Sequence, residues 1–405
     1  MTKTVKKTVK KSMAVMLLAL CLVLTGCSGG QEIESCLFVL SMAVDPAPDG
    51  NLTVTVKALS GTQEAVDGMT ASQQQEDGAD PAQDGGAQGG SAEQPEPGYI
   101  VMSATAPSCL RALNLLSSTT PRSVNLSQLR EIVISRTLAE TDATLSILKE
   151  IHGMYRANGE AIVVVTPDDA GDFIRRQRAI LGVRLSKYLE VLFDHFSEMD
   201  TIPPDAQLAA VIAAMESDTT DALAVYAASN RFDASLVLSG SADMNRLPGH
   251  LPRTSPAENE YLGSALFSGA RMTGTLTGEE TGLLCLMMGR AQRRSTFIGN
   301  ALYRTKLPTR VRRSIDEDGT LSVRIDMLLE HVAGAEQEAG ADIAAQIERE
   351  GVGVLLKLRA ASCDAIGFGR IAIRRCIDIP TWEALRWPDQ YESAGVRVAA
   401  KVRIQ

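Results

Sequence analysis

The sequence predicts a mixed α/β (α+β) protein of three domains, in which mixed β-sheets are flanked by helices. Strand-like and helix-like stretches alternate between residues 35 and 195, a pattern typical of sheets with at least partly parallel strands. Hairpin patterns and one long amphipathic stretch follow between residues 261 and 405. A chain of 405 residues is long enough for two or three domains.

The first expected elements form a β-hairpin. A continuous apolar run at 35–45 predicts a strand buried on both faces, and the alternating residues at 52–59 predict a half-buried strand. The Asp-Gly pair at 49–50 is the turn signal between them. Thr55 and Lys57 would lie on the polar face of the second strand.

The rest of the first domain, expected over residues 27–195, alternates strands with helices. The expected elements are a strand at 99–104, a helix at 108–116, a strand at 130–135, a helix at 141–155, a strand at 161–166 and a helix start at 167–169. Ser108 is the expected N-cap of its helix. Leu110, Leu113 and Leu116 would form the inward face of that helix.

Residues 61–97 differ in composition from the rest of the first domain. They contain eight acidic residues and no lysine, arginine or aromatic residue. Such a segment buries too little apolar surface to offset the entropy that it would lose on ordering. We predict a disordered acidic loop inserted between two strands. A segment that binds cations or contacts the cell wall is the alternative.

A smaller middle connector domain is expected at 196–260. It contains a helical pattern at 204–217 and strand-like runs at 223–228 and 234–239. Prolines and a glycine at 247–256 mark the linker that ends it.

The third domain is expected over residues 261–405. Its expected elements are a hairpin at 262–276, a helix ending at 288, a hairpin at 310–329, a long helix at 342–361, a short helix ending at 376 and a closing strand at 396–404. Thr277 and Glu280 form a capping-box pattern that would start the first of these helices. Trp382 and Trp387 are expected to close one end of the core, with ligand binding as the alternative.

The N-terminus carries a signal segment. Five lysines precede an apolar run of about a dozen residues, which is too short to span a bilayer as an anchor helix. The run ends in Leu-Thr-Gly-Cys at 24–27, which resembles a bacterial lipobox. We therefore expect residues 1–26 to be a lipoprotein signal peptide and Cys27 to carry acyl chains such as palmitate. A membrane-spanning helix with an incidental cysteine is the alternative.

The charge of the chain excludes some classes of partner. The chain has 40 basic and 49 acidic residues, and loss of the five signal lysines leaves 35 basic residues and a net charge of −14. This balance disfavours nucleic acid and gives no attraction to anionic lipid headgroups. Membrane attachment would therefore depend on the lipid at Cys27, since two or more acyl chains give stable anchoring.

The remaining cysteines show no CxxC spacing, so they indicate neither a zinc site nor a disulfide framework. We interpret them as buried thiols, with a Cys363–Cys376 pair as the alternative. These cysteines are Cys36, Cys109, Cys285, Cys363 and Cys376.

No catalytic, cofactor-binding or metal-binding residue is expected. The histidines lie outside known metal motifs, and no GxSxG, P-loop or GxGxxG pattern occurs. Ser146 and Lys149 form an SxxK tetrad, but its partner motifs are missing. Asp168, Asp169 and Asp172 could bind a metal, although their position after a proline fits a helix N-terminus better.

Four stretches resemble the Ger(x)C family. Residues 263–289 look like its G-x-A-x-F strand, turn, M-x-G-x-L strand and helix start. Residues 364–404 are similar to its C-terminal pattern of D-x-x-G-F-G, two tryptophans and an alternating strand. Residues 38–56 resemble its first hairpin, with Asp45, and residues 156–166 resemble one of its inner strands.

Ger(x)C proteins are the C subunits of spore nutrient germinant receptors, lipoproteins on the outer face of the spore inner membrane. The resemblance implies three mixed α/β domains and integral-membrane A and B subunits as partners. It also implies a non-enzymatic role in spore germination, without a cofactor or a small-molecule ligand for this subunit. Only the lipidated Cys27 carries over as a functional position. Ser28-Gly29-Gly30 replaces the usual Trp and acidic residue after that cysteine.

The alternative function is that of a ligand-binding cell-surface lipoprotein of the solute-binding type. Such proteins need two similar doubly wound lobes, and only the first domain has that character. A wall-active hydrolase would require the SxxK helix to open into a cleft, and it is the least favoured hypothesis.

Overall fold

The computed structural model describes most of the chain after residue 34. The described residues are 35–60, 98–154, 156–180, 184–198, 200–231, 245–251, 258–290, 295–298, 301–334 and 340–405. The signal segment, Cys27, the acidic stretch 61–97 and the expected strand at 234–239 therefore lie outside the described residues.

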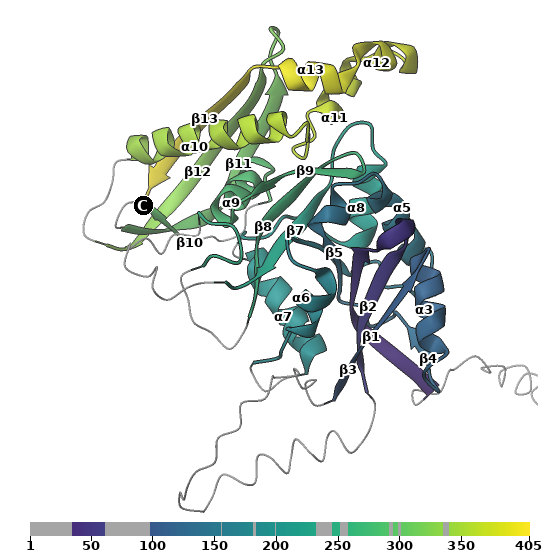
Figure 1. Ribbon diagram of the computed structural model, residues 1–405. Coiled ribbons are helices and arrows are strands. Elements are labelled where there is room, and N and C mark those ends of the chain that lie inside the picture. Colours follow the sequence, from purple (N-terminus) through teal and green to yellow (C-terminus); the bar gives the residue numbers. More distant parts are fainter. Residues whose placement is uncertain are drawn as a thin grey trace, which may run out of the picture.

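Nine strands of the described chain form one mixed sheet. Their order is β3-β2-β1-β5-β6-β7-β8-β9, with β4 beside β1 (Figure 1). The strands are β1 (Cys36–Pro46), β2 (Leu52–Leu59), β3 (Tyr99–Ala106), β4 (Ser123–Asn125), β5 (Glu131–Ser135), β6 (Ile162–Thr166), β7 (Leu223–Ser229), β8 (Asn259–Ser268) and β9 (Arg271–Leu276). The four central strands run parallel and the outer hairpins are antiparallel. The predicted mixed α/β fold class is confirmed.

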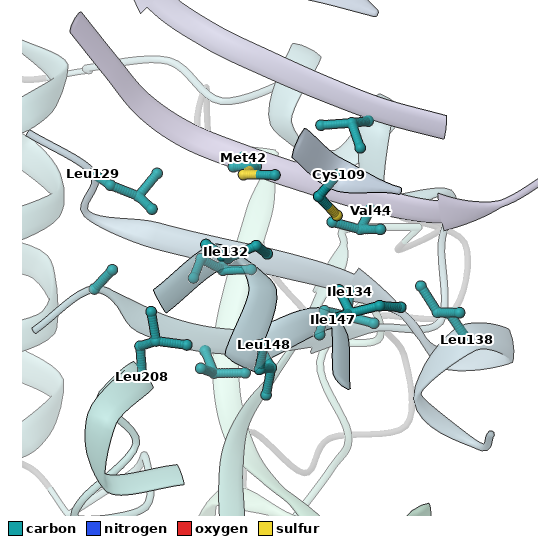
Figure 2. Close-up of a cluster of buried hydrophobic side chains, with 14 of the residues drawn as sticks. Met42, Val44, Cys109, Leu129, Ile132, Ile134, Leu138, Ile147, Leu148 and Leu208 are labelled. Carbon is teal, nitrogen blue, oxygen red and sulfur yellow. The ribbon is translucent and has the colours of Figure 1, made fainter. Parts of the chain in front are cut away.

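Helices cover both faces of this large sheet. The helices are α3 (Cys109–Ser117), α4 (Arg136–Ala139), α5 (Ala143–His152), α6 (Ala170–Arg175), α7 (Leu185–Glu198) and α8 (Leu208–Met215). Figure 2 shows the core on one face, where Met42 and Ile132 of the sheet meet Leu148 of α5 and Leu208 of α8. Side chains of α6 and α7 pack on the opposite face. Ser108 caps α3, as predicted.

The prediction that one face of β2 is polar and open to solvent is wrong. Thr55 and Lys57 are both buried, because α6 packs over the face of the hairpin on which they lie. The inward face of α3 also differs from the prediction. Leu113 and Leu116 are buried as predicted, but Leu110 is 49% exposed, and Cys109 and Ala112 complete the buried face instead.

The expected middle segment contributes β7 to the large sheet, between β6 and β8. The hairpin β8–β9, which was assigned by sequence to the third domain, continues the same sheet. The expected domain boundaries at 195 and 260 stay predictions.

A second sheet lies in the C-terminal part of the chain. Its order is β10-β11-β12-β13, and β13 runs parallel to β12. The elements of this part are α9 (Gly278–Met287), β10 (Ser295–Ile298), β11 (Ala301–Ile315), β12 (Leu321–Ala333), α10 (Gly340–Ala360), α11 (Gly369–Ala372), α12 (Ile379–Leu385), α13 (Trp387–Ser393) and β13 (Val396–Ile404). The capping box of Thr277 and Glu280 is present at α9. Helix α10 packs along β13 (Figure 1).

The C-terminal core also includes residues of the large sheet. Leu223, Leu266 and Leu276 pack in the same cluster as Leu355 and Phe368. The two sheets therefore share a hydrophobic contact, and the candidate site lies beside it. Among the described helices, none is both long and apolar enough to cross a bilayer.

Candidate functional site

The candidate site is built around the carboxylate of Asp364, which is only 3% exposed. Its Oδ1 accepts hydrogen bonds from the backbone amides of Gly367 and Phe368, each at 2.9 Å. Its Oδ2 accepts from the Gly369 amide at 2.6 Å and from the Trp387 indole Nε1 at 3.1 Å. The side chain thus fixes the loop between α10 and α11 and holds α13 against it.

A second carboxylate, that of Asp221, connects this loop to the large sheet. It accepts from the Asp364 amide at 2.7 Å and from the Gly269 amide at 3.0 Å. The Thr220 hydroxyl and the Asp221 amide both donate to the Asp364 carbonyl oxygen, each at 3.2 Å. We call this pair of carboxylates, Asp221 and Asp364, the joint, because it ties the start of β7 and the β8–β9 turn to the C-terminal part.

Two glycines of the DAIGFG stretch are required by this geometry. Gly367 has a φ of +78°, which a residue with a side chain adopts only with strain. A β-carbon at Gly369 would lie 2.7 Å from the Thr219 carbonyl oxygen and 2.8 Å from the Trp387 indole nitrogen. The glycines therefore let the backbone amides wrap closely around Asp364.

Burial sets the electrostatics of the joint. It raises the pKa of Asp364 from 3.8 to about 7, while the hydrogen bonds from Gly369, Phe368 and Trp387 act in the opposite direction. Burial also raises the pKa of Asp221, again against its backbone hydrogen bonds. Amide donors, with one indole donor, occupy both carboxylates, so the joint holds the loops around it in place.

A cleft of about 570 Å³ opens beside the joint, and we call it the aromatic cleft. Trp382 and Trp387 stack in its wall, with ring centroids 6.4 Å apart. Trp387 is buried, and Tyr391 next to it donates to the Cys363 carbonyl oxygen at 2.9 Å. The prediction that the tryptophans close one end of the core is confirmed for Trp387, whereas Trp382 is half-buried at the cleft.

Exposed apolar side chains lie next to the aromatic cleft. Ile377 is 95% exposed and Ile379, at the start of α12, is 72% exposed. Both exceed the exposure of every other large hydrophobic residue in the described chain. Ile379 lines the aromatic cleft, and Ile377 lies two positions before it in the chain.

The residues singled out as possible catalysts or metal ligands serve other contacts. Ser146 donates to the Ala143 carbonyl oxygen at 2.7 Å, and Lys149 pairs with Glu216 at 2.5 Å, both at exposed sites. No set of three or more potential ligands converges within the described residues.

Each of the three aspartates after β6 has a partner within the protein. Asp168 accepts from the Ser229 amide at 2.7 Å, and Asp169 caps α6. Asp172 pairs with Arg175 at 2.6 Å. The preferred prediction of a helix N-terminus is therefore confirmed.

All five cysteines in the described residues are free thiols, so Cys363 and Cys376 do not form the alternative pair. Burial raises the pKa of Cys363 well above its usual value and that of Cys109 to about 12. Buried thiols with raised pKa are poor nucleophiles.

The large sheet contains a further buried polar cluster, which the sequence did not indicate. Glu131 Oε1 accepts from the Ser41 hydroxyl at 2.7 Å and from the Gln177 side-chain amide, and Oε2 accepts from the Tyr261 hydroxyl at 3.1 Å. Lys57 donates to the Gln177 carbonyl oxygen and attracts Glu131. We call these five residues the Glu131 cluster.

Two family models match the chain in succession. The model described as spore germination protein N-terminal domain matches residues 29–228. The model described as spore germination B3/GerAC like, C-terminal, matches residues 262–405. The chain belongs to the Ger(x)C family of spore germination proteins. In this Ger(x)C protein the joint links the two matched parts, since Asp221 lies in the first and Asp364 in the second.

One solved structure aligns with most of this Ger(x)C protein. The crystal structure of the GerBC protein aligns with 90% of this chain and 96% of its own chain, at 12% identity and a TM-score of 0.43. No curated protein sequence matches the chain.

Proposed function

We propose that this Ger(x)C protein is a non-enzymatic lipoprotein subunit of a spore nutrient germinant receptor. Its partners would be the integral-membrane A and B subunits, and it would act through protein contacts on the extracytoplasmic face of the spore inner membrane. The observation that carries the proposal is the match of spore germination family models to residues 29–228 and 262–405.

Two features of the described residues support a role in contacts. The joint uses its buried carboxylates to hold loops, and both carboxylate oxygens of Asp364 accept from backbone or indole donors. The exposed isoleucines 377 and 379 offer an apolar surface beside the aromatic cleft.

The position of that surface favours protein over lipid as its partner. Lipidated Cys27 would lie eight residues before Ser35, and eight residues span at most about 28 Å. The start of β1 pairs with β4, and Figure 1 places β4 and α12 at opposite ends of the molecule. Helix α12 would therefore point away from the anchored end.

The first experiment replaces the anchor residue. In a spore-forming host, Cys27→Ala is expected to release the protein from membranes and to slow germination in response to nutrients, because the acyl chains are lost. Cys21→Ala is the matched control, since Cys21 lies in the signal segment and is removed with it. A released Cys27→Ala protein that supports normal germination contradicts the proposal.

The second experiment tests the contacts. Ile377→Ser combined with Ile379→Ser is expected to reduce co-purification of integral-membrane subunits from spore membranes without lowering the melting temperature, since both side chains are exposed. Val191→Ser on α7, at a residue 51% exposed, is the control. Absence of any receptor subunit from the wild-type preparation would favour the solute-binding alternative.

A further inference from the structure

A cleft of about 450 Å³ adjoins the aromatic cleft at the α8–β7 loop. Ser217, Thr220 and Asp221 contribute to the walls of both. Three arginines from separate elements line it, and we call it the arginine cleft. Arg290 follows α9, Arg313 lies on β11 and Arg370 lies on α11.

The three guanidinium groups are only partly neutralised. Arg290 pairs with Asp205 at 3.1 Å, and Arg313 donates to the Ile366 carbonyl oxygen at 3.0 Å. The Arg370 side chain, which is exposed, forms no ion pair with the described residues. Asp205 and Asp221 also line the cleft, but Asp205 is paired with Arg290, and the Asp221 carboxylate already accepts two backbone amides.

The arginines lie close enough to repel one another. The pKa of Arg313 is lowered first by desolvation and then by the positive charges of Arg370 and Arg290. Like charges gathered around one cleft are unfavourable unless an anion neutralises them. The mature chain is acidic as a whole, so this local cluster of positive charge stands out from its surroundings.

Small residues of α8 form part of the lining of the cleft. Ala210, Ala213 and Ala214 lie on the outer side of α8, where Ala213 is exposed and the other two are half-buried. An alanine surface lets a peptide backbone approach closely. Guanidinium groups at its edge can bind carboxylates with paired hydrogen bonds.

We propose that the arginine cleft binds an acidic peptide segment of a partner protein. The carboxylates of the segment contact Arg370 and Arg313, and its backbone lies over the alanines of α8. Charge complementarity and the small side chains of α8 select this occupant. The inference rests on the proposed role in protein contacts, and it names the chemistry of one such contact.

The test measures binding of a fluorescent peptide of alternating Glu and Ala to the detergent-solubilised full-length protein by anisotropy. Arg370→Gln is expected to weaken binding about tenfold, since a charged hydrogen bond is lost. Arg374→Gln is the matched control, because Arg374 is exposed on the neighbouring turn and does not line the cleft. Binding should also weaken with salt.

A second variant tests the alanine lining of the arginine cleft without a change of charge. Ala213→Leu is expected to weaken peptide binding several-fold while the melting temperature stays unchanged, because the residue is exposed. The peptide in which Gln replaces every Glu should bind far more weakly than the acidic peptide.

If the peptide binds, three results would still overturn the inference. One is equal loss of binding in Arg374→Gln and Arg370→Gln, and another is equal binding of the Gln and Glu peptides. The third is displacement of the peptide by inorganic phosphate but not by chloride at the same ionic strength, which would assign the cleft to small anions. If the peptide fails to bind while receptor subunits still co-purify, only this inference fails. If co-purification fails, the proposed function fails instead.

Discussion

The joint and the Glu131 cluster bury a carboxylate in two different ways. Glu131 is fully buried and Asp364 nearly so, and burial raises the pKa of both. The partners of Glu131 are two hydroxyls and a side-chain amide. The partners of Asp364 are three backbone amides and an indole.

This difference determines what each site can tolerate. A hydroxyl can rotate and accept a hydrogen bond, and a carboxamide can turn to exchange its donor and acceptor. Backbone and indole N–H groups can only donate. The Glu131 cluster can therefore adjust to a neutral amide, whereas Asp364 requires an acceptor at both oxygens.

The largest expected effect follows from this requirement. Above the Asp364 pKa of about 7, where the carboxylate is ionised, Asp364→Asn should lower the free energy of unfolding by about 2–4 kcal/mol, because its amide nitrogen must face N–H donors with no acceptor. Chemical denaturation followed by circular dichroism measures the change. Asp326→Asn is the control, since Asp326 is exposed on β12 and has no partner among the described residues.

If Asp364→Asn lowers the free energy of unfolding by less than about 1 kcal/mol, the proposed difference between the joint and the Glu131 cluster is wrong. It would mean that the loop between α10 and α11 rearranges to supply an acceptor. The charge-matched control should remain within about 0.5 kcal/mol of the wild type, as exposed substitutions usually do.

The next effect concerns pH. The pKa of Asp364 is about 7 in the folded protein against 3.8 for the free side chain. Between these values the folded state binds more protons than the unfolded state, so the free energy of unfolding should fall as pH rises from about 4 to 7. One proton limits this slope to about 1.4 kcal/mol per pH unit. Asp364→Asn should lack this contribution.

Tryptophan fluorescence gives an independent measure of the same titration. The chain has two tryptophans, so Trp382→Phe leaves Trp387 as the sole reporter beside Asp364. Its emission should change with a midpoint near pH 7. A flat profile through that range would show that the four donors keep the carboxylate ionised despite its burial.

The comparison also shows which parts of the fold could be predicted from sequence. Continuous apolar runs predicted strands such as β1 and β6, and the capping box predicted the start of α9, because these signals are local. The burial of Lys57 was not predictable. Alternation shows which residues share a face of a strand, but not that distant helices cover the polar face.

The joint was only partly visible in the sequence. The family resemblance drew attention to the D-x-x-G-F-G stretch, but no loop and no contact was predicted for its glycines. Asp221 gave no signal, since it lies 143 positions away and follows an ordinary helix end. Spacing along the chain cannot show a contact that depends on how two sheets meet.

The smallest expected effect is at Glu131. Glu131→Gln keeps the side-chain size, and the hydroxyls of Ser41 and Tyr261 can reorient around the new amide, so the free energy of unfolding should fall by about 1 kcal/mol. The substitution also removes the attraction to Lys57. If Glu131→Gln costs as much as Asp364→Asn, charge and not the type of donor governs both sites. Adding Lys57→Met to Glu131→Gln separates these causes, because the double variant should recover stability only when the unbalanced lysine is responsible.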